Sequence, residues 1–240
     1  MHPLEWFSGR TKRNPIGPIG LIGPILLMKD AELIESVAAH RVFAVVRARS
    51  AESALRAAEA AIVGGIKLVE VALATPGSFR VISDLRHRYG DRVCVGAGSV
   101  TNHDQMDRAI KGGAQFISMP HTSATLVEAC RRSLVPPVIG ALTPTEVATA
   151  WAMGVPIVTL FPASSMGGPE YVAAITSRLS DIRLAVAGGV GSENIVDYFD
   201  AGAFAISVGG RLFTSGDLKN ENYVAIAERA RGIIRLAGVV

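Results

Sequence analysis

The chain has 240 residues, 49% of them hydrophobic and 19% charged, which suits one large α/β domain and excludes an intrinsically disordered protein. Its formal net charge is only +3, and it has no basic run or basic patch interleaved with aromatic residues, so we expect no nucleic-acid partner. The two cysteines, Cys94 and Cys130, lie far apart and lack metal-type spacing, which indicates a reducing, intracellular compartment.

Residues 1–29 differ from the rest of the chain. Three basic residues fall within 1–16, and the apolar segment GPIGLIGPILLM follows at 17–28. Pro18 and Pro24 interrupt this segment and no small-residue cleavage site follows, which disfavours a signal peptide. It is also too short for a membrane-spanning helix. We predict an apolar arm that packs on the fold, on a neighbouring subunit or on a protein partner. The predicted location is cytoplasmic, with organellar targeting left open.

From residue 30 onward the pattern becomes regular. The segment AELIESVAAHR at 31–41 predicts an extra helix that closes the bottom of the fold. Eight short β-branched runs follow, each succeeded by an amphipathic segment, and the last helix is expected from Tyr223 onward. In chain order the runs are FAVVRA, KLVEVALA, VCVGAG, AQFISMP, PPVIGA, PIVTLFP, IRLAVAGG and AFAISVGG. Nearly continuous apolar strands are typical of a parallel sheet buried on both faces.

Eight strand–helix pairs predict a closed (β/α)8 TIM barrel over residues 30–240. An open, doubly wound sheet is the alternative. In such barrels the site lies at the C-terminal ends of the strands. Those ends hold Arg47, Glu70, Ser99, His121, Thr143, Thr159, Ala187 and Arg211.

Glu70 is the strongest catalytic candidate, because a carboxylate flanked by apolar residues on a barrel strand is costly to bury alone. It either forms an ion pair with Arg47 or acts as a general base whose pKa burial raises. His121 could bind a ligand from its loop. Glu70 and His121 are too few for a metal site, so we predict no metal and no cofactor.

Two glycine pairs follow the seventh and eighth strands, Gly188–Gly189 and Gly209–Gly210. Their free backbone amides could bind a phosphate at the position where barrels usually do so. Alternatively, glycine only allows each strand to turn into a helix. Arg211 could add a bidentate contact with a phosphate or carboxylate.

The motifs together resemble a known family. RVFAVVRA, GGIKLVEVALATPG, GAGSVTN, GAQFISMPH, GALTPTEV, LFPAS, AGGV and SVGGRLF resemble, in order, the motifs of the 2-keto-3-deoxy-6-phosphogluconate (KDPG) and 4-hydroxy-2-oxoglutarate (KHG) aldolases. The resemblance covers about residues 31–238. It implies a homotrimer of barrels and a class I lyase, in which a lysine on strand six forms a Schiff base with a 2-keto acid. The glutamate of strand two, here Glu70, would then move protons.

This chain departs from the family pattern at the site. The lysine position of the K-L-F-P motif is Thr159, and a hydroxyl cannot form an iminium with a ketone. Ala187 replaces a threonine, Ala74 occupies the region of an arginine, and Arg211 replaces a small residue. Ser99 stands for a common threonine, and Arg47, Pro120, Phe161 and Pro162 persist. The predicted substrate contacts are Arg47, Ser99, Pro120, His121 and Phe161. We expect none of the five lysines to point into the pocket.

Three interpretations follow. The first is a noncatalytic family member, a pseudoenzyme that binds a ligand or serves as a scaffold. The second is a lyase that cleaves or decarboxylates a small or phosphorylated 2-keto acid without a lysine, with a divalent ion as possible Lewis acid. The third is an ordinary aldolase with one altered position, for example by engineering, which the simultaneous change at Ala187 disfavours.

Overall fold

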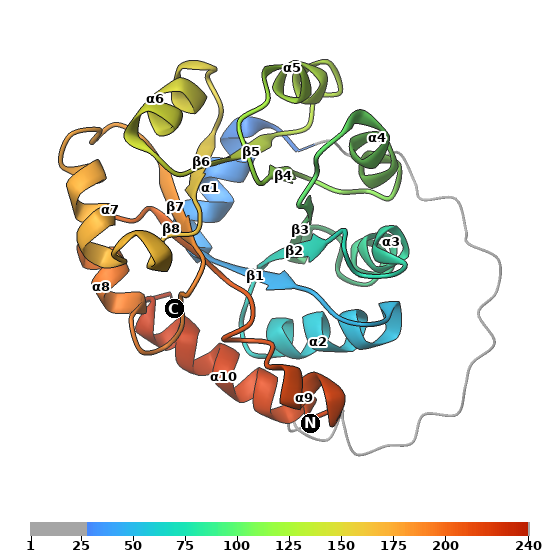
Figure 1. The fold of residues 1–240 in the computed structure, drawn as a ribbon. Helices are drawn as coiled ribbons and strands as arrows, with labels where there is room; N and C mark the ends of the chain where they lie inside the picture. The colour runs from blue at the N-terminus through green and yellow to red at the C-terminus, as the bar shows by residue number, and fades with distance from the viewer. Residues whose placement is uncertain (1–27, 240) are drawn as a thin grey trace.

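The computed structural model describes residues 28–239, and its centre is a closed barrel of eight parallel strands in chain order (Figure 1). The first and last strands pair, with Val42 opposite Ile206. The predicted TIM barrel is therefore confirmed, and the open doubly wound sheet is wrong. The strands are β1 (Val42–Val46), β2 (Leu68–Ala72), β3 (Cys94–Gly98), β4 (Ile117–Met119), β5 (Pro137–Ala141), β6 (Ile157–Leu160), β7 (Leu184–Ala187) and β8 (Ala205–Val208).

Helices surround the barrel, and half of those described begin at a residue whose side chain caps them. The side chains of Ser50, Asn102, Thr143 and Asn222 each accept a backbone N–H in the first turn of the helix they precede. The helices are α1 (Asp30–His40), α2 (Ala51–Val63), α3 (Ser78–Tyr89), α4 (His103–Lys111), α5 (Ala124–Arg132), α6 (Pro144–Ala152), α7 (Pro169–Thr176), α8 (Ile195–Asp200), α9 (Ser215–Lys219) and α10 (Tyr223–Leu236). The predicted first and last helices correspond to α1 and α10, whereas α9 was not predicted.

The lower end of the barrel interior is a plug of apolar side chains. Each strand, or the residue just before it, contributes one buried side chain, and Leu33 and Val37 of α1 pack beneath them. The contributors are Phe43, Leu68, Cys94, Phe116, Val138, Ile157, Ala185 and Ala205. The rings of Phe43 and Phe116 meet edge to face at 5.5 Å. Because α1 lies across this end, it closes the barrel there, as predicted (Figure 1).

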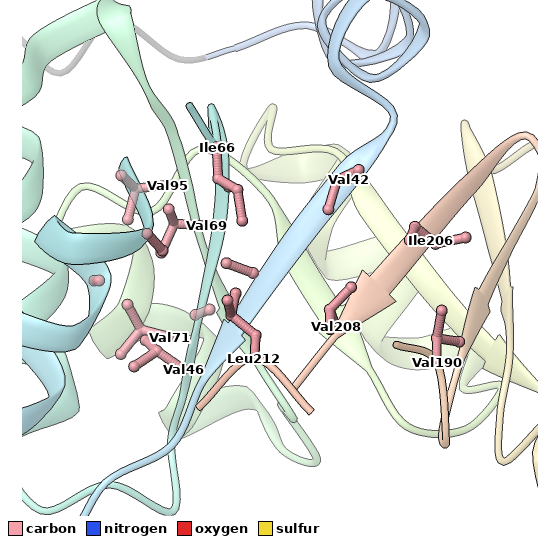
Figure 2. Close-up of a cluster of buried hydrophobic side chains, with 14 of the residues drawn as sticks. Val42, Val46, Ile66, Val69, Val71, Val95, Val190, Ile206, Val208 and Leu212 are labelled. Atoms are coloured by element: carbon pink, nitrogen blue, oxygen red, sulfur yellow. The ribbon is translucent and has the colours of Figure 1, made fainter. Parts of the chain in front are cut away.

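The outer faces of the strands form a second apolar layer beneath the helices. Figure 2 shows part of it, where Val42 of β1 lies near Ile206 and Val208 of β8, and Leu212 follows β8. Alternate residues of each strand thus serve the plug and this outer layer, as the period of two in a β-strand requires. Both faces are buried, which explains the near-continuous apolar strands of the sequence.

Within residues 28–239 no helix has the length and apolarity needed to cross a membrane. Residues 1–27 lie outside the described part of the chain. The prediction of a docking arm at 17–28 falls almost wholly on them, and it stays a prediction.

Candidate active site

Above the apolar plug, the inward-facing residues become small or polar. Two residues beyond each plug residue, the same alternation directs one further residue of each strand to the interior. These residues are Val45, Glu70, Gly96, Ser118, Gly140, Thr159, Ala187 and Ser207. Three lack a bulky side chain altogether, and neighbouring groups fill the space beside two of them, because the Phe116 ring lies against Gly96 and the Pro120 backbone against Gly140.

Glu70 is the ionisable residue of this layer. Its side chain keeps some contact with solvent at the mouth, but the surrounding protein desolvates the carboxylate and raises its pKa to about 7, which a hydrogen bond with Ser118 partly opposes. The carboxylate lies directly against Gly98 on β3. No ion pair joins it to Arg47 among the described residues, so that alternative is not supported. A carboxyl group with a pKa near 7 can both accept and donate a proton at neutral pH.

Thr159 lies on β6 in the same interior layer. It pairs in register with Gly140 of β5 and with Ala185 of β7, and its side chain is partly exposed. No lysine belongs to this layer. Lys67 lines a small hollow at the opposite end of the barrel, and Lys111 ends α4.

One lysine does face the upper side of the barrel. Lys219, the last residue of α9, lines a large cavity that also includes Val45 and Arg47 from β1 and the residue following it. The expectation that no lysine would face the pocket is therefore wrong for Lys219. The sequence could not show this, because α9 was missed and with it the turn that carries Lys219 back over the mouth.

The cavity has a volume of about 1270 Å³ and extends sideways from the mouth between the start of α2 and the α9 region. Small-molecule sites usually have volumes of about 300–1,000 Å³, so it can hold an elongated ligand. Gly209, Gly210 and Ala74 contribute to its wall, as do several polar residues after β1 and β8. The polar and charged residues of the wall are Arg47, Arg49, Ser50, Glu52, Ser53, Ser215, Lys219, Glu221 and Tyr223.

The two predicted phosphate-binding glycine pairs have different surroundings. At Gly210 an added Cβ would meet no atom within 4 Å, and this residue is open to the cavity. Gly188 and Gly189, with φ of 90° and 78°, pack instead against the chain after β6, where an added Cβ on Gly188 would lie 3.0 Å from Pro162. Ser164 lies directly against Gly189. Close packing and positive φ explain the pair Gly188–Gly189 without a ligand.

The remaining predicted residues lie around the mouth. Ser99 follows β3, Pro120 and His121 follow β4, and Phe161 follows β6 with 48% of its surface exposed. Arg211 turns away to form an ion pair of 3.3 Å with Glu193. The structure therefore gathers Glu70 and Thr159 in the barrel and Arg47, Gly209 and Gly210 at its mouth. It separates Gly188, Gly189 and Arg211 from that cavity.

Ser118 and Ser207 belong to the interior layer but were not predicted. Both stand two residues after a buried residue of the same strand, so strict counting by two from Phe116 and Ala205 would have found them. Within the described residues no three His, Cys, Asp or Glu side chains gather in a way that could hold a metal ion.

Comparison with known proteins places this geometry in context. The family model for KDPG and KHG aldolases matches residues 33–229. The 2-dehydro-3-deoxy-phosphogluconate aldolase of Treponema pallidum is 31% identical over 166 residues, which are 69% of this chain and 79% of that protein. The 2-dehydro-3-deoxy-6-phosphogalactonate aldolase of Escherichia coli is 31% identical over 176 residues, which are 73% and 85% of the two chains.

A solved structure with the same fold is KDPG aldolase from Legionella pneumophila, in which pyruvate is captured as a covalent carbinolamine intermediate. It is 26% identical to this chain, with a TM-score of 0.75, and the match covers 86% of this chain and 98% of that one.

Proposed function

The chain belongs to the KDPG and KHG aldolase family, and we propose that within it this protein binds a small anionic 2-keto acid without class I aldolase catalysis. The polar side chains of its interior layer and the cavity at its mouth would serve binding. On this proposal it is a pseudoenzyme, and its ligand-binding or scaffold role has replaced turnover.

The observation that carries the proposal is the residue at the interior position of β6. Schiff-base catalysis needs an amine that adds to the keto carbon and then loses water to give an iminium, which draws electrons from the bond to be broken. Thr159 stands at the position where the family motif carries its lysine, and its hydroxyl could at most add to the carbonyl and be released again. No lysine among residues 28–239 belongs to the interior layer, which supports a protein that lacks the electron sink of the family.

A second function is favoured by one observation, the raised pKa of Glu70. A carboxyl group with a pKa of about 7 inside the barrel is suited to proton transfer. With a divalent ion to polarise the keto group, Glu70 could assist cleavage or decarboxylation of a 2-keto acid without a lysine. Because no described cluster of three protein ligands exists, such an ion would have to share its coordination with the substrate and water.

One assay separates the two functions. Pyruvate release from KDPG and from 4-hydroxy-2-oxoglutarate is measured with the native protein, with Mg²⁺ or Mn²⁺, with chelator, and with an active aldolase of the family as positive control. Binding of both compounds is measured by calorimetry in parallel. Binding without release supports the binding protein. Release that is lost with chelator and in Glu70→Gln supports the metal-assisted lyase.

Release that survives both treatments contradicts both proposals, because it requires an electron sink that neither includes. If neither KDPG nor 4-hydroxy-2-oxoglutarate binds, the proposed binding function is contradicted.

We further propose that the protein is a cytoplasmic homotrimer and that residues 17–28 dock on a protein partner. Sedimentation equilibrium should give three times the mass of 25.2 kDa. A monomeric mass at micromolar concentration would contradict the trimer.

A further inference from the structure

The cavity beside the barrel mouth carries an excess of positive charge. Arg47, Arg49 and Lys219 line it, and none of the three forms an ion pair with another residue in the described part of the chain. Two carboxylates, Glu52 and Glu221, also line the wall. Glu221 is already neutralised, since Arg56 contacts it at 3.1 Å. Three cations therefore face one unpaired carboxylate.

The segments that carry these charges are held in place by the fold. Arg49 directly precedes Ser50, whose side chain caps α2, and Lys219 ends α9. The start of α9 is fixed by Thr214, which accepts the N–H of Asp217, and Asp217 is paired with Arg229 of α10 at 2.9 Å. Since α10 packs along α2 (Figure 1), the two sides of the cavity belong to one rigid layer.

The loop after β7, which forms one part of the usual phosphate site of barrels, is occupied by the chain itself. The backbone N–H of Gly191 donates to the Asn194 side chain at 2.9 Å, and that side chain donates in turn to the Gly189 carbonyl at 3.0 Å. The carboxylate of Glu193 lies directly over Gly191. The guanidinium of Arg211, which could otherwise contact an anion here, is already engaged by this carboxylate.

We propose that the lateral cavity binds the distal anionic group of an elongated, doubly charged ligand, with Arg49 and Lys219 as its contacts and Gly209–Gly210 as its floor. This inference rests on the proposed function, in which the keto-acid end of the same ligand lies in the barrel near Glu70. It assigns the anion to the β1–α2 and α9 side rather than to the loop after β7. A phosphate and a carboxylate are both oxyanions that arginine and lysine side chains can bind, so either group would fit this cavity.

The test compares ligands of different length on the same variants by calorimetry. The probes are KDPG, with a distal phosphate, 2-oxoglutarate, with a distal carboxylate, and pyruvate, which has no distal anion. The variants are R49A/K219A, E193Q and the control R132A, which removes an exposed arginine of α5 that pairs only with Glu128 within its own helix.

We expect R49A/K219A to weaken binding of KDPG roughly tenfold at low salt, because two surface contacts with an anion are lost. Pyruvate binding and the R132A control should stay unchanged, and E193Q should bind all probes as the native protein does. An equal loss for 2-oxoglutarate would identify a general anion site, and a loss for KDPG alone a phosphate site. Both results support the proposal.

Three results with the variants would overturn this proposal. They are unchanged KDPG affinity in R49A/K219A, equal weakening of pyruvate, and a tenfold gain of KDPG affinity in E193Q, which would place the anion in the loop after β7. Failure of KDPG and 2-oxoglutarate to bind the native protein at millimolar concentration would overturn it as well. Turnover is measured separately, so catalysis would contradict the proposed function and leave this assignment standing.

Discussion

Glu70 of β2 and Ser118 of β4 meet across an intervening strand that offers no side chain between them. The strand is β3, whose inward-facing residues at this height are Gly96 and Gly98. A Cβ added to Gly98 would lie against the Glu70 carboxylate and 3.0 Å from the Cβ of Ser118. Gly98 therefore makes room for a contact between residues 48 positions apart in the chain.

The pKa of Glu70 gives a stability signature. Its value is about 7 in the folded protein, against 4.5 for an ordinary glutamate, so between these pH values the folded state holds a proton that the unfolded state releases. The free energy of unfolding should therefore fall as pH rises from about 4.5 through 7, by roughly 3 kcal/mol in total.

Glu70→Gln removes this titration. Urea unfolding is measured at pH 5 and pH 8. Over this interval the free energy of unfolding should fall by about 3 kcal/mol more in the native protein than in the variant. Equal pH dependence in the two proteins would mean that Glu70 ionises normally.

Gly98→Ala should displace the carboxylate. The added methyl group overlaps the end of the Glu70 side chain, which must turn away from Ser118 towards the solvent of the mouth. We expect a loss of roughly 1–3 kcal/mol in stability and a pKa for Glu70 that moves back towards 4.5. The control is Gly232→Ala in α10, where an added Cβ meets no atom within 4 Å and should stabilise by up to about 1 kcal/mol. An unchanged pH profile in Gly98→Ala would contradict the packing.

Thr159→Lys tests how much of the catalytic site is missing. An amine at this position lies within the interior layer and should form an imine with pyruvate, which borohydride reduction and mass spectrometry detect. We expect cleavage of KDPG to stay within about tenfold of background, because Ala187 and Arg211 also depart from the family pattern. Thr159→Met supplies a similar length without an amine and should give no adduct. Rapid cleavage by the lysine variant would show that Thr159 alone disables the protein.

The ion pair between Arg88 of α3 and Glu59 of α2 should contribute measurably to stability. The Glu59 side chain is only 7% exposed and contacts Arg88 at 2.5 Å. Arg88→Ala leaves this carboxylate buried and unpaired, at a cost of about 2 kcal/mol, and adding Glu59→Gln should restore part of it. Arg132→Ala, which breaks an exposed pair with Glu128, should cost less than about 1 kcal/mol. Equal effects from the two arginine variants would mean that the burial of Glu59 does not matter.

The barrel was predictable because local patterns dominate it. Strand β6 lies within the run predicted from PIVTLFP, and α10 begins at Tyr223 as expected. Buried parallel strands leave a continuous apolar signal that needs no knowledge of tertiary contacts. Glu70 could be found in the same way, since an acidic residue within such a run is costly to bury.

The lateral cavity could not be predicted, because it joins the region after β1 to a short helix near the end of the chain. The five residues of α9 carry too little periodic signal to show a helix, so the position of Lys219 at the mouth could not be predicted. The contrast between Gly188 and Gly210 was equally hidden. Both belong to identical dipeptides, and only the packing of Pro162 and Ser164 distinguishes them.

The apolar plug and α1 make the barrel a blind-ended well. A ligand that enters from the mouth must leave by the same route, and one seated beside Glu70 would lie between this carboxyl group and the opening. The carboxyl group would then exchange protons with the ligand rather than with buffer.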